Sequence, residues 1–547
     1  MEEGRRGKKG REGKEEIAIF AKEKSTEMAK EFNTAVTCDP RRHYMVDTTE
    51  KMKVFERLIN GGKYFTISYA RQFGKSTSLN WILRNMSDRY LVIPASFEIT
   101  SPKEWSNEDT FCRYFCTKIV SACENVEDKD VVKFWEGAKQ TEKLDFDILA
   151  SKITEFCRKA GKKVVLTIDE VDKSLDNQLF LGFLSMLRSM YLDREKFGDE
   201  KYTFWSVVLA GVYDVKSMKV RIRPDEEHRF NSPWNVAAEY DLEMEFNPRE
   251  IGTMLEEYEE EHHIGFDIKE IAEEIYKYTS GYPVLVSRIC KEIDENLERS
   301  WTKEGVLKAV KRIIGTKTNL SESMTSNLEL NPKLKAFIRA LLMENFSVLY
   351  DANNPTMDFA RMFSIIKKDN EGRVEIHNLI FQQILINYFI SENELETLTP
   401  GVGLKTFIDK NGDLNMPMII NRFKDLVSKK HNKEAEFLER EGRFMFICFL
   451  KPIINGTGFY YSEPENDDST RMDLVINYNR KEYVVELKIW HGTEYEISGR
   501  EQIAEYLTTR NLEEGYLVTF SFLKNKVVQE RPEWIEHSGK RIYEAVI

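Results

Sequence analysis

Residues 63–77 read KYFTISYARQFGKST, and this stretch decides the fold expected for the first half of the chain. The apolar run from Tyr64 to Ser68 predicts a short strand, and a helix is predicted to begin near Lys75 after a polar turn. The turn ends in GKST at positions 74–77, the final part of the phosphate-binding pattern G-x-x-x-x-G-K-S/T. Tyr69 occupies the place of the first glycine of that pattern, so the match is incomplete. A strand, a loop and a helix in this order nevertheless predict a phosphate-binding loop.

The chemistry of such a loop comes from its backbone and from two side chains. Backbone N–H groups of the loop and of the first helical turn face the phosphates, where the helix dipole favours negative charge. Lys75 would reach the β- and γ-phosphates, and the Ser76 hydroxyl would bind magnesium, so we expect ATP and Mg2+ as cofactors. The residues expected at the nucleotide are Arg71, Gln72, Phe73, Gly74, Lys75, Ser76 and Thr77, together with Asp169.

Residues 163–170, KVVLTIDE, form the clearest buried strand of the sequence and end in two carboxylates. Such a continuous apolar run is typical of a parallel sheet that is covered on both faces. In a hydrolytic nucleotide site, Asp169 would hold magnesium through Ser76 and water, and Glu170 would polarise the attacking water. The pattern also fits an ordinary strand end whose carboxylates begin a helix, and this alternative stays open.

Two further apolar runs, Tyr90 to Phe97 and Phe204 to Ala210, alternate with helical segments and predict a doubly wound α/β domain. Acidic amphipathic helices follow, such as Arg249 to His262, and predict a helical lid. A β-hairpin is then predicted from strands at Met362 to Ile366 and Arg373 to Ile376. The expected order is a charged flexible tail (1–30), a P-loop NTPase domain (31–240), the lid (241–330), a winged-helix-like module (331–400) and an α+β unit (401–547).

The last unit carries a pair of carboxylates beside a lysine. Strands are predicted from Met472 to Tyr478 and from Tyr483 to Ile489, which places Asp473 near Glu486 once the hairpin closes. Alternation along a strand puts Glu486 and Lys488 on one face. Two carboxylates can bind magnesium that activates water at a phosphodiester, while the lysine orients or deprotonates that water. An exposed, charged hairpin face is the other interpretation of this pattern.

These residues resemble two known groups. The sequence D-x(n)-E-x-K at 473–488 resembles the core of restriction-endonuclease-like enzymes. Cys38-Asp-Pro, the HYMV stretch at 43–46 and residues 63–76 resemble the AAA-like ATPase domain of bacterial proteins that carry a PD-(D/E)xK nuclease tail. Members of that family typically also lack the first glycine of the phosphate loop. Motifs at 223–235 and the SGYP turn at 280–283 look like later parts of the same family.

The resemblance implies a C-terminal restriction-endonuclease-like α/β domain with a Mg-dependent endonuclease activity that ATP gates. The implied setting is defence against foreign DNA or turnover of mobile elements. It implies Gln502, within the helical Q-x-x-x-Y at 502–506, as a site residue, and one acidic residue among 434–441, of which Glu441 is favoured slightly. Residues that could sense the γ-phosphate are Arg221, Arg223 and Arg229, although solvated loop arginines fit the sequence equally well.

Composition limits how nucleic acid could be held. The chain has 547 residues, with 80 Lys and Arg against 92 Asp and Glu, and the net charge of -12 argues against coating DNA through bulk charge. Residues 401–547 hold 21 basic and 24 acidic residues. Any contact with DNA would therefore rest on clustered lysines, which could equally form one solvated helix face. The cluster consists of Lys424, Lys429, Lys430 and Lys433.

The lack of a secretory signal in the sequence and the spacing of its cysteines favour a reducing, cytoplasmic setting. Residues 1–16 have no apolar core like that of a secretory signal, and no run approaches the roughly 18 apolar residues that span a bilayer. The seven cysteines include no C-x-x-C pair, which argues against metal fingers and a disulfide framework. We expect no membrane partner, and a homo-oligomer, ring or dimer, stays open.

A second function fits the same motifs. The P-loop domain could act as a nucleotide-dependent switch or scaffold, with an inactive nuclease-fold tail that recruits partners. A helicase-like motor is disfavoured, because no strand-separating motifs follow Glu170.

Overall fold

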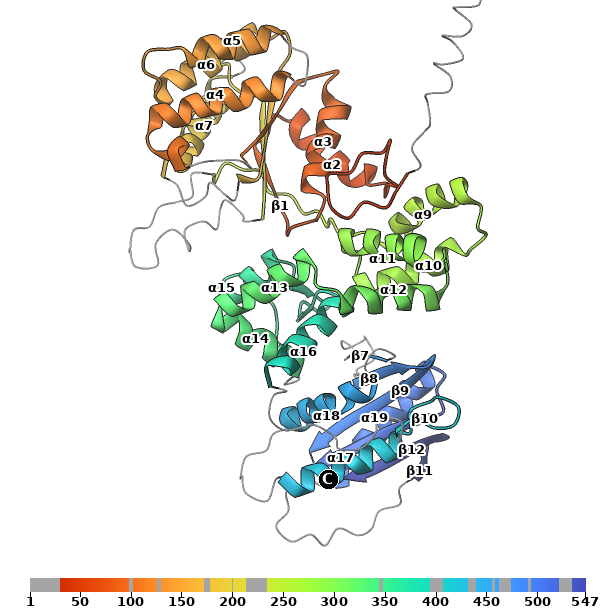
Figure 1. Ribbon diagram of the computed structural model, residues 1–547. Coiled ribbons are helices and arrows are strands. Elements are labelled where there is room, and N and C mark those ends of the chain that lie inside the picture. Colours follow the sequence, from red (N-terminus) through yellow and green to blue (C-terminus); the bar gives the residue numbers. More distant parts are fainter. Residues whose placement is uncertain are drawn as a thin grey trace, which may run out of the picture.

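The computed structural model places its elements in three regions, from α2 to β4, from α9 to α16, and from α17 to β12 (Figure 1). Within the described residues, no helix combines the length and the apolar character needed to cross a membrane. The structure describes residues 30–97, 102–124, 129–171, 178–198, 200–212, 234–343, 348–393, 407–430, 439–454, 458–461, 474–489, 493–520 and 534–547.

Within the described residues, four parallel strands form the first sheet, and the ends of each agree to within two residues with one of the predicted apolar runs. Their order is β1-β4-β3-β2, so β4 lies between the strand before the phosphate loop and the strand that ends in Asp169. Because the strands are parallel, their carboxyl ends and the loops that follow meet at one edge. The strands are β1 (Phe65–Ser68), β2 (Leu91–Ser96), β3 (Val164–Asp169) and β4 (Ser206–Gly211).

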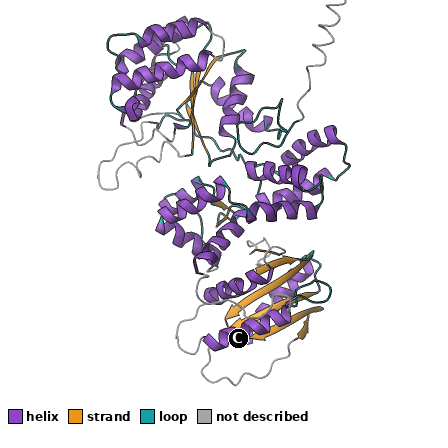
Figure 2. Ribbon diagram, in the orientation of Figure 1, coloured by secondary structure: helices purple, strands orange, loops and turns teal. Residues whose placement is uncertain are grey.

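Helices cover both faces of this sheet, which confirms the predicted doubly wound α/β fold (Figure 2). Alternate strand residues enter different cores: Val165 and Val208 pack with α2 and α3, whereas Val164 and Leu166 pack with α4 to α7. The first pair of helices is α2 (Thr49–Asn60) and α3 (Lys75–Met86). The other face is covered by α4 (Glu108–Glu124), α5 (Lys129–Lys139), α6 (Phe146–Lys159) and α7 (Gln178–Phe197), after the short 3-10 helix η1 (Pro102–Trp105).

Four helices lie within the described residues 248–315 of the predicted lid (241–330). The first begins sharply, because the Asn247 side chain accepts the backbone N–H of Glu250, and Pro248 stands at the first helical position. The segment before α2 packs against this helix, where the backbone N–H of Met45 donates to Glu257 at 2.9 Å. The helices are α9 (Pro248–His262), α10 (Ile268–Thr279), α11 (Pro283–Asn296) and α12 (Lys303–Gly315).

The next module consists of helices around a short antiparallel hairpin. Its first strand begins at Ile366, not at Met362 as the sequence suggested. Asn354 caps the start of α15, and Pro355 occupies its first position. The helix runs to Met362 and so includes the first residue of the predicted strand. The elements are α13 (Asn319–Leu330), α14 (Pro332–Met343), α15 (Pro355–Met362), β5 (Ile366–Lys368), β6 (Val374–Ile376) and α16 (Leu379–Asn393).

In the described part of the C-terminal region, six strands form a second sheet in the order β11-β12-β10-β9-β8-β7. The predicted hairpin is present as β8 and β9, joined by Asn479 and Arg480, which both have the positive φ of a tight hairpin turn. The helix α19 connects β9 to the parallel strand β10. The helices are α17 (Met416–Lys430), α18 (Glu439–Ile454) and α19 (Thr493–Thr509). The strands are β7 (Phe459–Tyr461), β8 (Leu474–Tyr478), β9 (Lys481–Ile489), β10 (Glu514–Phe520), β11 (Trp534–His537) and β12 (Lys540–Val546).

Candidate functional site

The predicted phosphate loop joins β1 to α3 at the carboxyl edge of the first sheet. Gly74 has a φ of 75° just before α3, and Gln72 has a φ of 64°, so the loop turns through two left-handed residues. The ammonium of Lys75 donates to the carbonyl oxygens of Tyr69 and Ala70, both at 2.9 Å. Lys75 thus lies across its own loop, at the N-terminus of a helix whose backbone N–H groups favour an anion.

The structure brings Ser76 and Asp169 together from positions 93 residues apart. The Ser76 hydroxyl donates to a carboxylate oxygen of Asp169 at 2.5 Å, and Glu170 follows with a φ of 56°. The other carboxylate oxygen of Asp169 accepts the backbone N–H of Glu170 at 2.9 Å. All three side chains are partly exposed. A hydroxyl and a carboxylate oxygen at a helix N-terminus are the donor types that Mg2+ prefers.

The other loop residues divide into exposed and anchored ones. Arg71 and Gln72 are exposed, whereas Phe73 is buried among aromatic rings. The hydroxyl of Thr77 accepts the backbone N–H of Cys38 at 3.3 Å, which ties the earlier CDP stretch to the start of α3. The Tyr282 hydroxyl donates to the Arg71 carbonyl at 3.0 Å. The sequence indicated a turn around Tyr282 but no role for this side chain.

Three of the predicted C-terminal side chains lie together between β9 and α19. The Glu486 carboxylate and the Lys488 ammonium form an ion pair at 2.9 Å on one face of β9. Lys488 also donates to the side-chain oxygen of Gln502 on α19 at 3.1 Å. Glu486 is only 2% exposed, so its charge is compensated by the lysine rather than by bulk water.

Several predicted residues lie outside the described part of the chain. These are Asp473, the side chain of Glu441 in α18, the three arginines Arg221, Arg223 and Arg229, and the side chains of Lys429, Lys430 and Lys433. Lys424 is described and is exposed on α17. Among the described residues, no three His, Cys, Asp or Glu side chains form a group that could hold a metal ion. A metal set that includes Asp473 is therefore a proposal.

A second ion pair lies on the same sheet, and no motif in the sequence indicated it. Arg500 of α19 makes a bidentate contact with Glu544 of β12, with its second N–H···O distance at 2.8 Å. Strand register aligns Glu486 with Leu517, and Leu517 with Glu544, so all three face one side of the sheet. Positions 44 residues apart show no common pattern in a single sequence, which is why this pair was missed.

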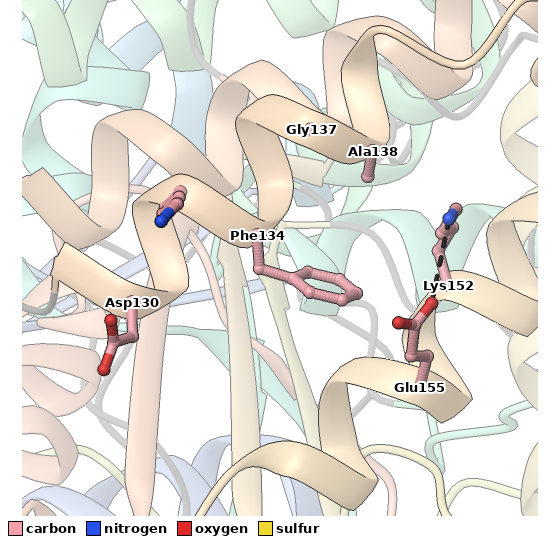
Figure 3. Close-up of a pocket in the computed structure, with 7 residues that line it drawn as sticks. Asp130, Phe134, Gly137, Ala138, Lys152 and Glu155 are labelled. Atoms are coloured by element: carbon pink, nitrogen blue, oxygen red, sulfur yellow. Dashed lines mark ion pairs between the residues drawn. The ribbon is translucent and has the colours of Figure 1, made fainter.

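A cavity of about 390 Å³ lies elsewhere, on helices that carry none of the predicted site residues. It opens between α5 and α6, with the ring of Phe134 between the two helices (Figure 3). Lys152 and Glu155 form an ion pair there at 3.7 Å. This cavity contributes nothing to the two sites described above.

The family model described as an AAA-like domain matches residues 35–370, which include the phosphate loop, β3 and the lid helices. No curated protein sequence matches the chain. The chain is similar to the Walker-type ATPase PABY2304 of Pyrococcus abyssi, with 13% identity and a TM-score of 0.41 over 65% of this chain and 99% of that one. It is also similar to the ORC2 protein of Aeropyrum pernix, with 12% identity and a TM-score of 0.39 over 66% of this chain and 98% of that one. A third similar structure is the RuvB Holliday junction branch migration motor of Thermotoga maritima, with 14% identity and a TM-score of 0.30 over 60% of this chain and 90% of that one.

Proposed function

Since this chain belongs to the AAA-like domain family, we propose that it binds and hydrolyses ATP and couples this to a metal-dependent DNA nuclease in its C-terminal region. The observation that carries the first half is the hydrogen bond between Ser76 and Asp169, at 2.5 Å. It joins the end of the phosphate loop to the strand end that bears the second carboxylate, Glu170.

Each residue of the nucleotide site has a distinct task in this proposal. Lys75 leaves the carbonyls of Tyr69 and Ala70 and turns to the β- and γ-phosphates. Ser76 and Asp169 hold magnesium, which neutralises phosphate charge when bound. Glu170 accepts a hydrogen bond from the attacking water and orients it toward the γ-phosphate. Arg71, Gln72, Phe73, Gly74 and Thr77 shape the loop around the phosphates.

The C-terminal site supplies the nuclease half of the proposal. Glu486 and Asp473 offer the hard oxygen donors that suit Mg2+, which would act as a Lewis acid at the phosphodiester when bound. Lys488 orients or deprotonates the attacking water, and Gln502 holds the lysine from α19 at 3.1 Å. Because Lys488 already occupies one oxygen of Glu486, metal binding must share or displace this contact.

DNA is the partner that we propose for this site, within a cytoplasmic protein that has a winged-helix-like module at 331–400 and a restriction-endonuclease-like domain at 401–547. Residues 401–547 are slightly acidic, so DNA would contact local basic residues such as the exposed Lys424 rather than a broad positive surface.

Cleavage of a panel of labelled nucleic acids tests the proposed activity. Purified full-length protein with Mg2+ should cut at least one DNA among single-stranded, duplex and branched forms, and RNA of the same sequence serves as the comparison. The Asp473→Ala and Lys488→Ala variants should cut far more slowly than the wild type. Nucleotide binding without cleavage of any substrate would instead support the switch or scaffold function.

A further inference from the structure

The phosphate loop packs against two later regions of the chain through the ring of Phe73. This ring is 1% exposed and lies 4.5 Å from the ring of Tyr282, at the start of α11, in a T-shaped contact. It also lies 6.2 Å from the ring of His377, two residues before α16. The Tyr282 ring in turn contacts His377 at 5.3 Å and Phe381 of α16 at 5.1 Å. The loop, the lid and α16 therefore meet in one aromatic cluster (Phe73, Tyr282, His377 and Phe381).

Polar contacts fix the His377 ring in this cluster from both of its nitrogens. Nε2 lies 3.3 Å from the Glu245 carboxylate, and Nδ1 lies 3.3 Å from the Asn378 amide. The Asn378 side chain also accepts the backbone N–H of Phe381 at 2.8 Å, which caps α16. Burial alone would raise the pKa of the Glu245 carboxyl. The hydrogen bond and the charge of His377 act in the opposite direction, and the net pKa of Glu245 lies below its ordinary value. The contact between His377 and Glu245 thus favours a charged carboxylate.

The helix α16 reaches from this cluster toward the C-terminal region. It has 15 residues and a length of roughly 22 Å at the usual rise per residue. Its sequence, LIFQQILINYFISEN, is apolar on all sides, and Ile380, Leu385 and Phe389 are buried. It packs against helices of the lid and of its own module, and it contacts β7 of the second sheet. One packed helix therefore touches both the aromatic cluster and the sheet that carries Glu486.

We infer that α16 transmits the state of the phosphate loop to the C-terminal sheet, with His377 as the positioning residue at the contact with Phe73. This inference rests on the proposed function, since it concerns the same loop and the same C-terminal site. Lys75 must leave the Tyr69 and Ala70 carbonyls to reach a phosphate. The next loop residues contact the lid, because the Arg71 carbonyl accepts the Tyr282 hydroxyl and the Phe73 ring packs on the Tyr282 ring. Because densely packed side chains leave little free volume, a shift of one ring in the cluster moves the neighbouring rings with it.

Hydrogen exchange of the full-length protein, measured by mass spectrometry, tests this inference. The exchange is compared with and without a non-hydrolysable ATP analogue and Mg2+. A separate fluorescence titration measures the affinity for the analogue. In the wild type, saturating analogue should change the exchange rate of peptides from α16 by about fivefold or more, the lower end of usual coupling. In His377→Leu the affinity should stay within about threefold, while the response of α16 is lost.

Two further variants separate positioning from folding. His377→Gln keeps a donor for Glu245 without the ring, and it should also lose the response; it replaces His377→Leu if that variant fails to fold. Phe359→Leu removes a ring of the same module that packs on Phe363 rather than on the loop, and it should respond as the wild type does. If α16 responds fully in both His377 variants, or does not respond in a wild type that binds the analogue, this inference is wrong. If the wild type does not bind the analogue, the proposed function fails and the inference falls with it.

Discussion

The two candidate sites use similar residue types in opposite surroundings. At the first sheet, Ser76 and Asp169 meet at an open edge, and both side chains are partly exposed. At the second sheet, Glu486 is 2% exposed and is bound to Lys488, beneath α19. Under the proposed function, the first site would accept a phosphate once the Lys75 side chain turns, whereas the second would have to exchange part of a buried ion pair for a metal. We therefore expect a control step at the second site, where Lys488 would compete with the proposed metal for Glu486.

The largest expected effect comes from removing the lysine of the buried pair. Lys488→Ala should reduce Mg-dependent cleavage by about 100-fold to 10,000-fold, the range of a positioned general base. It also leaves the Glu486 carboxylate buried without its cation, so metal affinity should be measured alongside the cleavage rate. The control is Glu536→Gln, an exposed carboxylate on β11 of the same sheet, which should cut as the wild type does. Equal cleavage by Lys488→Ala and the wild type would remove this lysine from the mechanism.

At the open edge, Glu170→Gln should separate binding from hydrolysis. The neutral side chain no longer draws a proton from water, so the rate of ATP hydrolysis should fall by about 100-fold or more. Affinity for ATP should change by less than about threefold, because Lys75 and Ser76 remain in place. A steady-state phosphate-release assay and a binding titration give the two values. Parallel loss of both would mean that Glu170 supports the fold of the loop instead.

Lys75→Ala should weaken nucleotide binding by about 10-fold to 100-fold, which corresponds to the loss of charge-assisted hydrogen bonds to phosphate. Lys53→Ala is the matched control, since Lys53 is an exposed lysine on α2 that pairs only locally with Glu50. Titration with a fluorescent ATP analogue measures both variants. Retained affinity in Lys75→Ala would show that the phosphate loop is assigned wrongly.

The smallest effects compare one glycine from each site. Gly74 has a φ of 75°, and no atom lies within 4 Å of the place where a Cβ would stand, so Gly74→Ala should lower the free energy of unfolding by about 1–2 kcal/mol through backbone strain alone. Gly499 lies in α19, where a Cβ would meet Leu517 at 3.3 Å and Lys488 at 3.9 Å. The helical gain from alanine, about 1 kcal/mol, would offset this crowding, so Gly499→Ala should be nearly neutral in urea denaturation. A strongly destabilised Gly499→Ala would show that α19 is packed on β9 more tightly than the contacts indicate.

Local patterns in the sequence predicted the elements that depend on neighbours along the chain. Four apolar runs became the four strands of the first sheet, and the D-x(n)-E-x-K spacing placed Glu486 and Lys488 on one face. No single apolar run predicts the strand order β1-β4-β3-β2, although this order places Ser76, after β1, within hydrogen-bond distance of Asp169 at the end of β3. The start of the short hairpin was misplaced because the residues from Met362 to Ile366 fit a helix end as well as a strand.

Contacts between distant segments could not be predicted in this way. His377 lies more than 300 residues from Phe73, and Arg500 of α19 pairs with Glu544 of β12. Such pairs depend on how finished elements pack, and periodicity within one segment carries no information about its partner. Phe73 belongs to the predicted phosphate loop, and Glu544 faces the same side of the second sheet as Glu486.

The most direct test of an ATP-gated nuclease measures DNA cleavage by the full-length protein at fixed Mg2+, with and without ATP, in the wild type and in Lys75→Ala. We predict that ATP raises the cleavage rate of the wild type by about fivefold or more, the usual scale of coupling between sites, and leaves the rate of Lys75→Ala unchanged. Cleavage that is equal with and without ATP in a wild type that binds ATP would contradict the coupling of the two sites.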